Sequence, residues 1–211
     1  MSRFKCLPKR PYKTIDFPRL IRHRVTPSIK RPMNITRTTL PKNSVLNTSG
    51  KKYDYVDSFQ GILNGDKNEF TSVEIAKAFF SSGPKWVGKL FTVRNKIVSL
   101  FGLKTSNNTG SRESQIETFK CEPGERIGIF KVFFRNVDEV ILGEDDKHLN
   151  FRVSLLLDAR TGQPDKKYLI ISTTVQFNNL FGRLYFLPVQ PFHKLIVPSM
   201  LKGIIKKLGN R

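Results

Sequence analysis

The stretch LGEDDKHLNFRVSLLLD, residues 142–158, decides the fold, because apolar and polar side chains alternate along its second half. Leu149, Phe151, Val153, Leu155 and Leu157 would share one face of a strand, and His148, Asn150, Arg152 and Ser154 the other. This period of two predicts a β-strand with one apolar face. The acidic run Glu144-Asp145-Asp146 before it is either a chemical site or the polar turn that opens the strand.

Strand-like segments surround this stretch on both sides. They are YDYVDSFQ (53–60), RIGIFKVFF (126–134), VDEVIL (137–142) and YLIISTTVQF (168–177). The connections between the last segments are short, with Arg135-Asn136 and DARTGQPD (158–165) as turns. Short connections between successive strands predict an antiparallel meander.

Two helices are predicted between the first strand and the meander. TSVEIAKAFF, 71–80, begins with a capping box in which Thr71 is the cap and Glu74 stands three positions later. A second helix starts at Pro84, and the sequence after it has an apolar stripe at helical spacing: Trp86, Leu90, Val93, Ile97 and Leu100. A loop is expected at 105–114.

The C-terminal segment, 178–210, changes to a helical period. Phe192, Leu195, Ile196, Met200 and Ile204 suit one face of a long helix that Gly209 ends. Pro188, Pro191 and Pro198 are expected to break or kink it, with Pro191 as the start of the main helix and Pro198 as a kink. We therefore predict an α+β domain in which this helix lies across one face of a curved antiparallel sheet, with a short helix-helix insert after strand 1.

The formal charge of +20 is concentrated at the N-terminus. Residues 1–52 hold 14 Lys or Arg and one acid, Asp16, a net of +13, and the remainder has 23 bases and 16 acids, a net of +7. We interpret 1–40 as a basic, disordered extension and 41–209 as a single domain. Alternatives are a start at Met33, an organelle transit peptide, or an arm that contacts nucleic acid or anionic membrane.

Cysteine use and hydropathy favour a cytoplasmic protein. Cys6 and Cys121 have no partner spacing, which predicts a reducing compartment. The chain has no run of 18 apolar residues, so no transmembrane helix is expected, and no apolar region follows the first basic residues as it would in a secretory signal.

Several blocks resemble the bacterial family catalogued as domain of unknown function 2867, over about residues 40–205. The resemblance rests on YVDSF, GPKWVGKLFTVRNKIVSLFGLK, RIGIFKV, VILGEDDKHLNFRVSL and VQFNNLFGRLYFLPVQPFHKLIVPSML. The matching positions are Gly143, Asp145, Asp146, His148, Leu149, Phe151 and Arg152, then Asn179, Gly182, Arg183 and Tyr185, then Pro191, Phe192 and His193. One departure is Asn178, where the family pattern has His.

The resemblance implies a fold more than an activity. The family's order of strands is similar to the START-like, helix-grip superfamily, whose members usually enclose an apolar cavity between sheet and long helix and bind lipids or polyketides. That step is an analogy between folds, which cannot establish function alone.

The acidic cluster is a poor metal site. Glu144, Asp145, Asp146 and His148 lack the twelve-residue spacing of a calcium loop, and one histidine does not make a zinc set. We expect Asp145 and Asp146 to close a hairpin turn, or to pair with Arg152 or Arg183. No metal and no cofactor is expected.

The leading hypothesis is the binding of a small hydrophobic or amphipathic, lipid-like or polyketide-like ligand between sheet and C-terminal helix. The predicted ligand contacts are Trp86, Arg94, Phe130, Phe151, Arg152, Val153, Asn179, Phe192 and His193. The first alternative is an acid-base enzyme, a cyclase or dehydratase, that uses His148 and His193 with Asp145 or Asp146. The second is an interaction module without a ligand. Nucleic acid or anionic membrane is expected to meet only the basic tail.

Overall fold

The computed structural model describes residues 33–48, 50–64, 70–90, 92, 112–159 and 166–209. Residues 1–32, Arg94 and most of the loop expected at 105–114 lie outside this part of the chain. The chain divides into two units at Pro32, and the fold described below is that of the second, Met33–Arg211.

The described fold is α+β, as predicted, and its centre is a seven-stranded antiparallel sheet. The strand order is β1-β2-β7-β6-β5-β4-β3. The bounds are β1 Thr36–Arg37, β2 Tyr55–Asn64, β3 Arg126–Ile127, β4 Phe130–Arg135, β5 Glu139–Asp145, β6 Leu149–Ala159 and β7 Lys166–Phe177. The predicted meander is confirmed in β4 to β7, and the first predicted strand, β2, pairs with β7.

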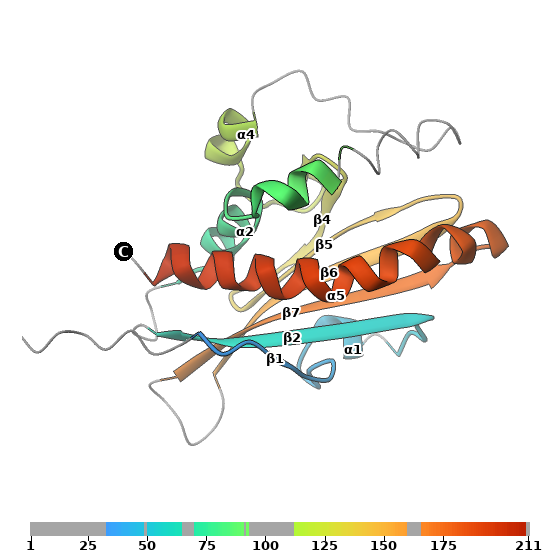
Figure 1. Cartoon of the computed structure of the whole chain (residues 1–211). Helices are drawn as coiled ribbons and strands as arrows, with labels where there is room; N and C mark the ends of the chain where they lie inside the picture. The colour runs from blue at the N-terminus through green and yellow to red at the C-terminus, as the bar shows by residue number, and fades with distance from the viewer. Residues whose placement is uncertain are drawn as a thin grey trace, which may run out of the picture. The chain divides into compact units, whose positions relative to one another are not determined.

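Helices cover one face of this sheet. Helix α5, Leu180–Leu208, runs lengthwise along it, and α2, Ser72–Ser81, packs beside the C-terminal half of α5 (Figure 1). The capping box at the start of α2 forms as predicted, because Thr71 accepts from the Glu74 backbone and Glu74 reaches back to the backbone of Thr71. A helical segment at 85–90 follows Pro84.

The alternation in β6 predicts which side chains face α5. The apolar side of the sheet and the inner side of α5 share the core, in which Leu155, Leu169, Leu201 and Ile204 are fully buried. Burial of one such leucine or isoleucine stabilises the fold by about 1.5–3 kcal/mol. The core therefore joins the sheet and the C-terminal helix into one unit.

The opposite face of the sheet is anchored to the segment 33–48, which includes α1, Val45–Thr48. The buried carboxylate of Glu139 accepts from the Ser44 hydroxyl at 2.6 Å, the Ser154 hydroxyl at 2.5 Å and the Val45 backbone at 2.8 Å. Three donors compensate the cost of burying this charge. The folded unit therefore starts before residue 40, since Thr36 and Arg37 already pair with β2.

Three local predictions need correction. The strand expected over 126–134 is interrupted, because Gly128 has a φ of 60° and turns β3 back on β4. A short helix, α4 Arg112–Thr118, begins inside the expected loop.

The prolines do not break the C-terminal helix either. Pro188, Pro191 and Pro198 all lie within the continuous α5. Each proline leaves the carbonyl four residues earlier without its helical partner. These carbonyls belong to Leu184, Leu187 and Lys194, all exposed residues, so the losses fall on the exposed side of the helix and its buried side continues.

Candidate functional site

A cavity of about 860 Å³ lies between the sheet, α2 and α5. Phe151, Val153 and Val175 line it from the sheet, and Val189 and Ile196 line it from α5. Most of its lining is aliphatic or aromatic, and its size is in the range of pockets that hold small molecules. Its charged lining residues, Lys85, Arg112 and Glu113, are exposed.

Aromatic rings form the wall where α2 meets the sheet. Phe130 packs edge-to-face against Phe79, Phe80 and Phe151, with ring centroids 5.4, 5.9 and 5.7 Å apart. Phe119 extends the cluster through Phe80. Edge-to-face pairs of this kind stabilise a fixed arrangement of rings, so this wall is stiff.

A polar cluster stands at the α5 side of the sheet. Asp57 on β2 is 2% exposed, and its Oδ2 accepts from the Tyr55 hydroxyl at 2.8 Å. The same oxygen lies 3.4 Å from Nδ1 of His193 on α5, too far for a well-formed hydrogen bond. The other carboxylate oxygen, Oδ1, has no hydrogen-bond partner among the described residues.

Beside Asp57 lie the partly buried Tyr55 and the buried Thr173. Burial, followed by the hydrogen bond and the charge of Asp57, raises the pKa of the Tyr55 phenol well above its usual range, so Tyr55 remains a donor. Thr173 faces Asp57 across the strands, is 1% exposed and lines the cavity. Within the described chain its hydroxyl has no partner.

The predicted ligand contacts divide into two groups. Phe130, Phe151, Val153, Phe192 and His193 line the cavity. Trp86, Arg152 and Asn179 are not among its lining residues, and Arg94 lies outside the described residues.

The three residues outside the lining have other positions. Arg152 is on the opposite face of β6 from Phe151, because adjacent strand residues point to opposite faces. Its guanidinium binds Asp145 at 2.7 Å and lies 3.6 Å from the ring centroid of Phe133. Trp86 is 40% exposed, and Asn179 is the N-cap of α5.

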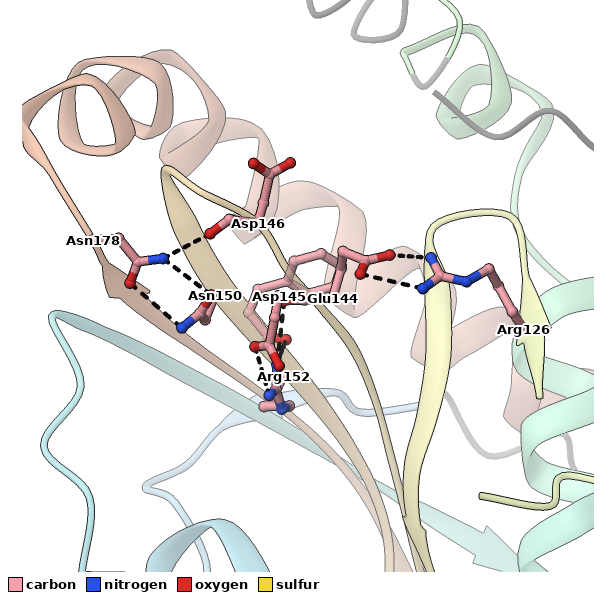
Figure 2. Close-up of polar contacts among 8 residues, drawn as sticks. Arg126, Glu144, Asp145, Asp146, Asn150, Arg152 and Asn178 are labelled. Carbon is pink, nitrogen blue, oxygen red and sulfur yellow. Dashed lines mark hydrogen bonds and ion pairs between the residues drawn. The ribbon is translucent and has the colours of Figure 1, made fainter. Parts of the chain in front are cut away.

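The acidic run is a turn held by ion pairs and amides. Figure 2 shows Glu144 paired with Arg126 and Asp145 with Arg152. Asn178 donates to the Asp146 carbonyl at 2.7 Å and forms side-chain hydrogen bonds with Asn150 (Figure 2). β5 and β6 form the predicted hairpin, and Asp145 pairs with Arg152, whereas Arg183 pairs with Asp54.

The β5–β6 turn also holds the start of α5. Asn179 donates to the Lys147 carbonyl at 3.0 Å and caps the helix by accepting from the Gly182 backbone at 3.1 Å. The Asn178 backbone donates to the His148 carbonyl at 2.9 Å. We call this set of contacts, from residues 144–152 to residues 178–182, the hairpin clamp.

The two histidines occupy separate environments. His148 stacks against Phe181 with ring centroids 4.5 Å apart, and its Nδ1 lies 3.2 and 3.1 Å from the amide oxygen and nitrogen of Asn179. His193 meets Asp57. The structure brings His193 to the cavity and leaves His148 out of its lining, so the acid-base set of His148, His193 and Asp145 or Asp146 is not assembled there.

Asp57, Tyr55 and Thr173 were not predicted as site residues. A signal for the first existed, since Asp57 shares the predicted strand face of Tyr53, Tyr55 and Phe59. An acid on an aromatic strand face needs a polar partner when that face is buried. The partner, His193, could not be seen, because the two residues meet only through tertiary packing.

The described residues contain no group of three or more His, Cys, Asp or Glu side chains arranged to hold a metal ion. None of the described helices, α5 included, has the length and hydropathy of a membrane span.

The site defines an α+β protein with an apolar cavity under its C-terminal helix. The family model described as protein of unknown function (DUF2867) matches residues 50–200, and the chain belongs to this family. Comparison with curated proteins and with solved structures returned no match. The family prediction is confirmed, and the START-like grouping stays a prediction.

Proposed function

We propose that this protein binds a small hydrophobic or amphipathic molecule in the cavity between the sheet and α5. The supporting observation is the cavity itself, about 860 Å³ and lined mainly by apolar side chains. Transfer of apolar ligand surface from water to such a lining is favourable by about 25 cal/mol per Å². An apolar space of this size also favours ligand binding over the alternative of an interaction module with a filled core.

The arrangement of charge supports an apolar body for the ligand. The cationic lining residues Lys85 and Arg112 are exposed, whereas the interior of the lining is formed by residues such as Val153, Ile171 and Phe186. A charged group placed among those side chains would lose its hydration without a compensating ion pair. The ligand therefore places its apolar part inside and any charged part toward the exposed residues.

A matched pair of substitutions on α5 tests the proposal. Ile196 lines the cavity, and its neighbour Leu195 is 62% exposed and outside the lining. Ile196→Trp should fill part of the cavity and weaken binding of the neutral fluorophore N-phenyl-1-naphthylamine roughly tenfold, which corresponds to about 1.4 kcal/mol. Leu195→Trp should leave the affinity unchanged.

The readout is fluorophore affinity, with native mass spectrometry of the purified protein to detect co-purifying molecules. Equal affinities for Ile196→Trp, Leu195→Trp and the unaltered protein would show that the fluorophore binds elsewhere. No binding by any of the three, and no co-purifying molecule, would refute the proposed function.

Acid-base catalysis in the same cavity is the second candidate. The observation in its favour is the buried Asp57 beside His193, an arrangement that suits a general base. It uses different residues from the predicted set of His148, Asp145 and Asp146. A ligand recovered from His193→Phe protein in the same chemical form as from unaltered protein would leave binding as the function.

A further inference from the structure

The His193 side chain lines the cavity, and its ring has Nδ1 turned toward Asp57. Its Nδ1 atom is buried and lies 3.4 Å from Oδ2 of Asp57. The side chain as a whole is 21% exposed and lines the cavity, whereas the Asp57 side chain is 1% exposed. Since Nδ1 and Nε2 are on different sides of the ring, Nε2 points away from the carboxylate.

The charge of Asp57 favours one tautomer of the neutral His193 ring. Nδ1 is too far from Oδ2 for a well-formed hydrogen bond, but at 3.4 Å a lone pair on Nδ1 would be repelled by the carboxylate, whereas an N–H is attracted to it. The Tyr55 hydroxyl donates to the same oxygen at 2.8 Å and fixes the carboxylate in this orientation. In the neutral ring the second nitrogen, Nε2, then presents a lone pair, and Asp57 acts as a positioning residue.

We propose that the cavity selects an apolar molecule that carries a hydrogen-bond donor, a hydroxyl group, which donates to Nε2 of His193. This inference rests on the proposed binding function and specifies its ligand class. A head group that only accepts, such as a carboxylate or an ether, would place its lone pairs against that of Nε2. A carboxylate directed inward would also approach the buried charge of Asp57.

The other polar and charged residues of the lining also favour a ligand with a neutral hydrogen-bond donor over an anionic one. The Thr173 hydroxyl, across from Asp57 in the sheet, has no partner within the described chain and offers a second contact to a hydroxyl ligand on rotation of its side chain. The cations of the lining, Lys85 and Arg112, are exposed, so they would meet an anionic head group only at the outside.

Displacement of bound N-phenyl-1-naphthylamine by dodecanol and by dodecyl methyl ether tests the inference, because the two differ in the donor and share the chain. The unaltered protein should bind the alcohol roughly 3- to 10-fold more tightly, the effect of one net hydrogen bond. His193→Phe, which keeps a ring and removes the acceptor, should bind both compounds equally. His148→Phe, at a histidine outside the lining, should retain the preference.

Asp57→Asn tests whether Asp57 sets the tautomer of the His193 ring or only stabilises the fold. In the Tyr55→Phe background, where no hydroxyl holds an oxygen toward Nδ1, the amide nitrogen of this Asn can donate to Nδ1, which moves the ring proton to Nε2 and makes this nitrogen a donor. The preference for the alcohol should then disappear or reverse toward the ether. The ¹⁵N shifts of the His193 ring should report the change of tautomer directly, and retained fluorophore binding shows that the variant is folded.

The outcomes distinguish this inference from the function on which it rests. Fluorophore binding with equal displacement by alcohol and ether would overturn the hydroxyl preference and leave the cavity function intact. A preference that persists both in His193→Phe and in Asp57→Asn on the Tyr55→Phe background would assign recognition to other groups and overturn the inference too. Absence of fluorophore binding by the unaltered protein would refute both.

Discussion

The hairpin clamp and the Asp57–His193 pair are built from the same kinds of side chain, acids, a histidine and neutral polar groups, and they differ in how their hydrogen bonds are satisfied. In the clamp, Asp145 pairs with Arg152, and Asn178 and Asn179 donate to backbone carbonyls. Around Asp57, three side chains have buried polar atoms without hydrogen-bond partners among the described residues: Asp57, Thr173 and His193.

The clamp and the Asp57–His193 pair also differ in solvent exposure. The clamp residues are partly exposed, so water satisfies what their neighbours do not: the Asp145 side chain is 51% exposed. Asp57 is 2% exposed, and a buried polar group without a partner costs about 1–3 kcal/mol. Buried polar groups that lack partners beside a cavity are candidates for contacts with a ligand on that ground. The polar side chains of the β5–β6 turn, by contrast, are explained by the ion pair and hydrogen bonds that they form there.

The largest expected effect comes from breaking the clamp at Gly182. A Cβ at this position would overlap the carbonyl oxygen of His148, which is backbone and cannot swing aside. Gly182→Ala should therefore lower the free energy of unfolding by roughly 1–3 kcal/mol, the usual cost of overpacking. Thermal denaturation followed by circular dichroism measures the change.

The control is a glycine in the helical segment at 85–90. Nothing lies within 4 Å of a Cβ built at Gly88, so Gly88→Ala should leave stability unchanged or raise it, since Ala favours helix over Gly by about 1 kcal/mol. Equal losses for both variants would show that the approach of α5 to the β5–β6 turn does not stabilise the fold.

Local patterns predicted the elements that carry the clamp, although not the contacts between residues 144–152 and 178–182, because the determinants of each element are close in sequence. The capping box of Thr71 and Glu74, the alternation through Phe151 and Val153, and the polar turn at 144–148 all follow from neighbours a few residues apart. The break expected at the prolines of α5 does not occur, because local rules do not include the core that holds the helix.

Only some of the cavity residues could be predicted, because the sequence does not show which face of the sheet a helix covers. The alternation in β6 already put Arg152 opposite Phe151, so both could not line one cavity, although both were predicted as ligand contacts. Period two decides the face of a residue, and it does not show which face is covered by a helix. Asp57 meets His193 because α5 crosses β2, a tertiary contact that no spacing in the sequence reveals.

A smaller effect, of opposite sign to the first, is expected at Thr173. Its buried hydroxyl makes no hydrogen bond to the described residues, so Thr173→Val removes a desolvated polar group and keeps the shape. The free energy of unfolding should stay constant or rise by up to about 1 kcal/mol in a denaturant titration. Ser154→Ala is the matched control, because the Ser154 hydroxyl donates to buried Glu139 and its loss should destabilise the protein. A clear loss in Thr173→Val would show that this hydroxyl is already satisfied in the unliganded fold.

The smallest expected effect is a dependence on alkaline pH that arises from Tyr55. Its pKa is raised above the ordinary value of 10.0 by burial first, then by the hydrogen bond and the charge of Asp57. A phenol whose pKa is higher in the folded than in the unfolded state contributes stability that is complete below pH 10 and is lost as the pH rises beyond it. Comparison of unaltered protein with Tyr55→Phe in an alkaline titration, by the absorbance of tyrosinate, isolates this group. In Asp57→Asn the pKa of Tyr55 should fall only part of the way back toward 10.0, because burial, the largest cause of the raised pKa, remains. Titration of Tyr55 at the ordinary value in the unaltered protein would mean that its hydroxyl does not donate to Asp57, and the carboxylate would then lose the contact that holds it against His193.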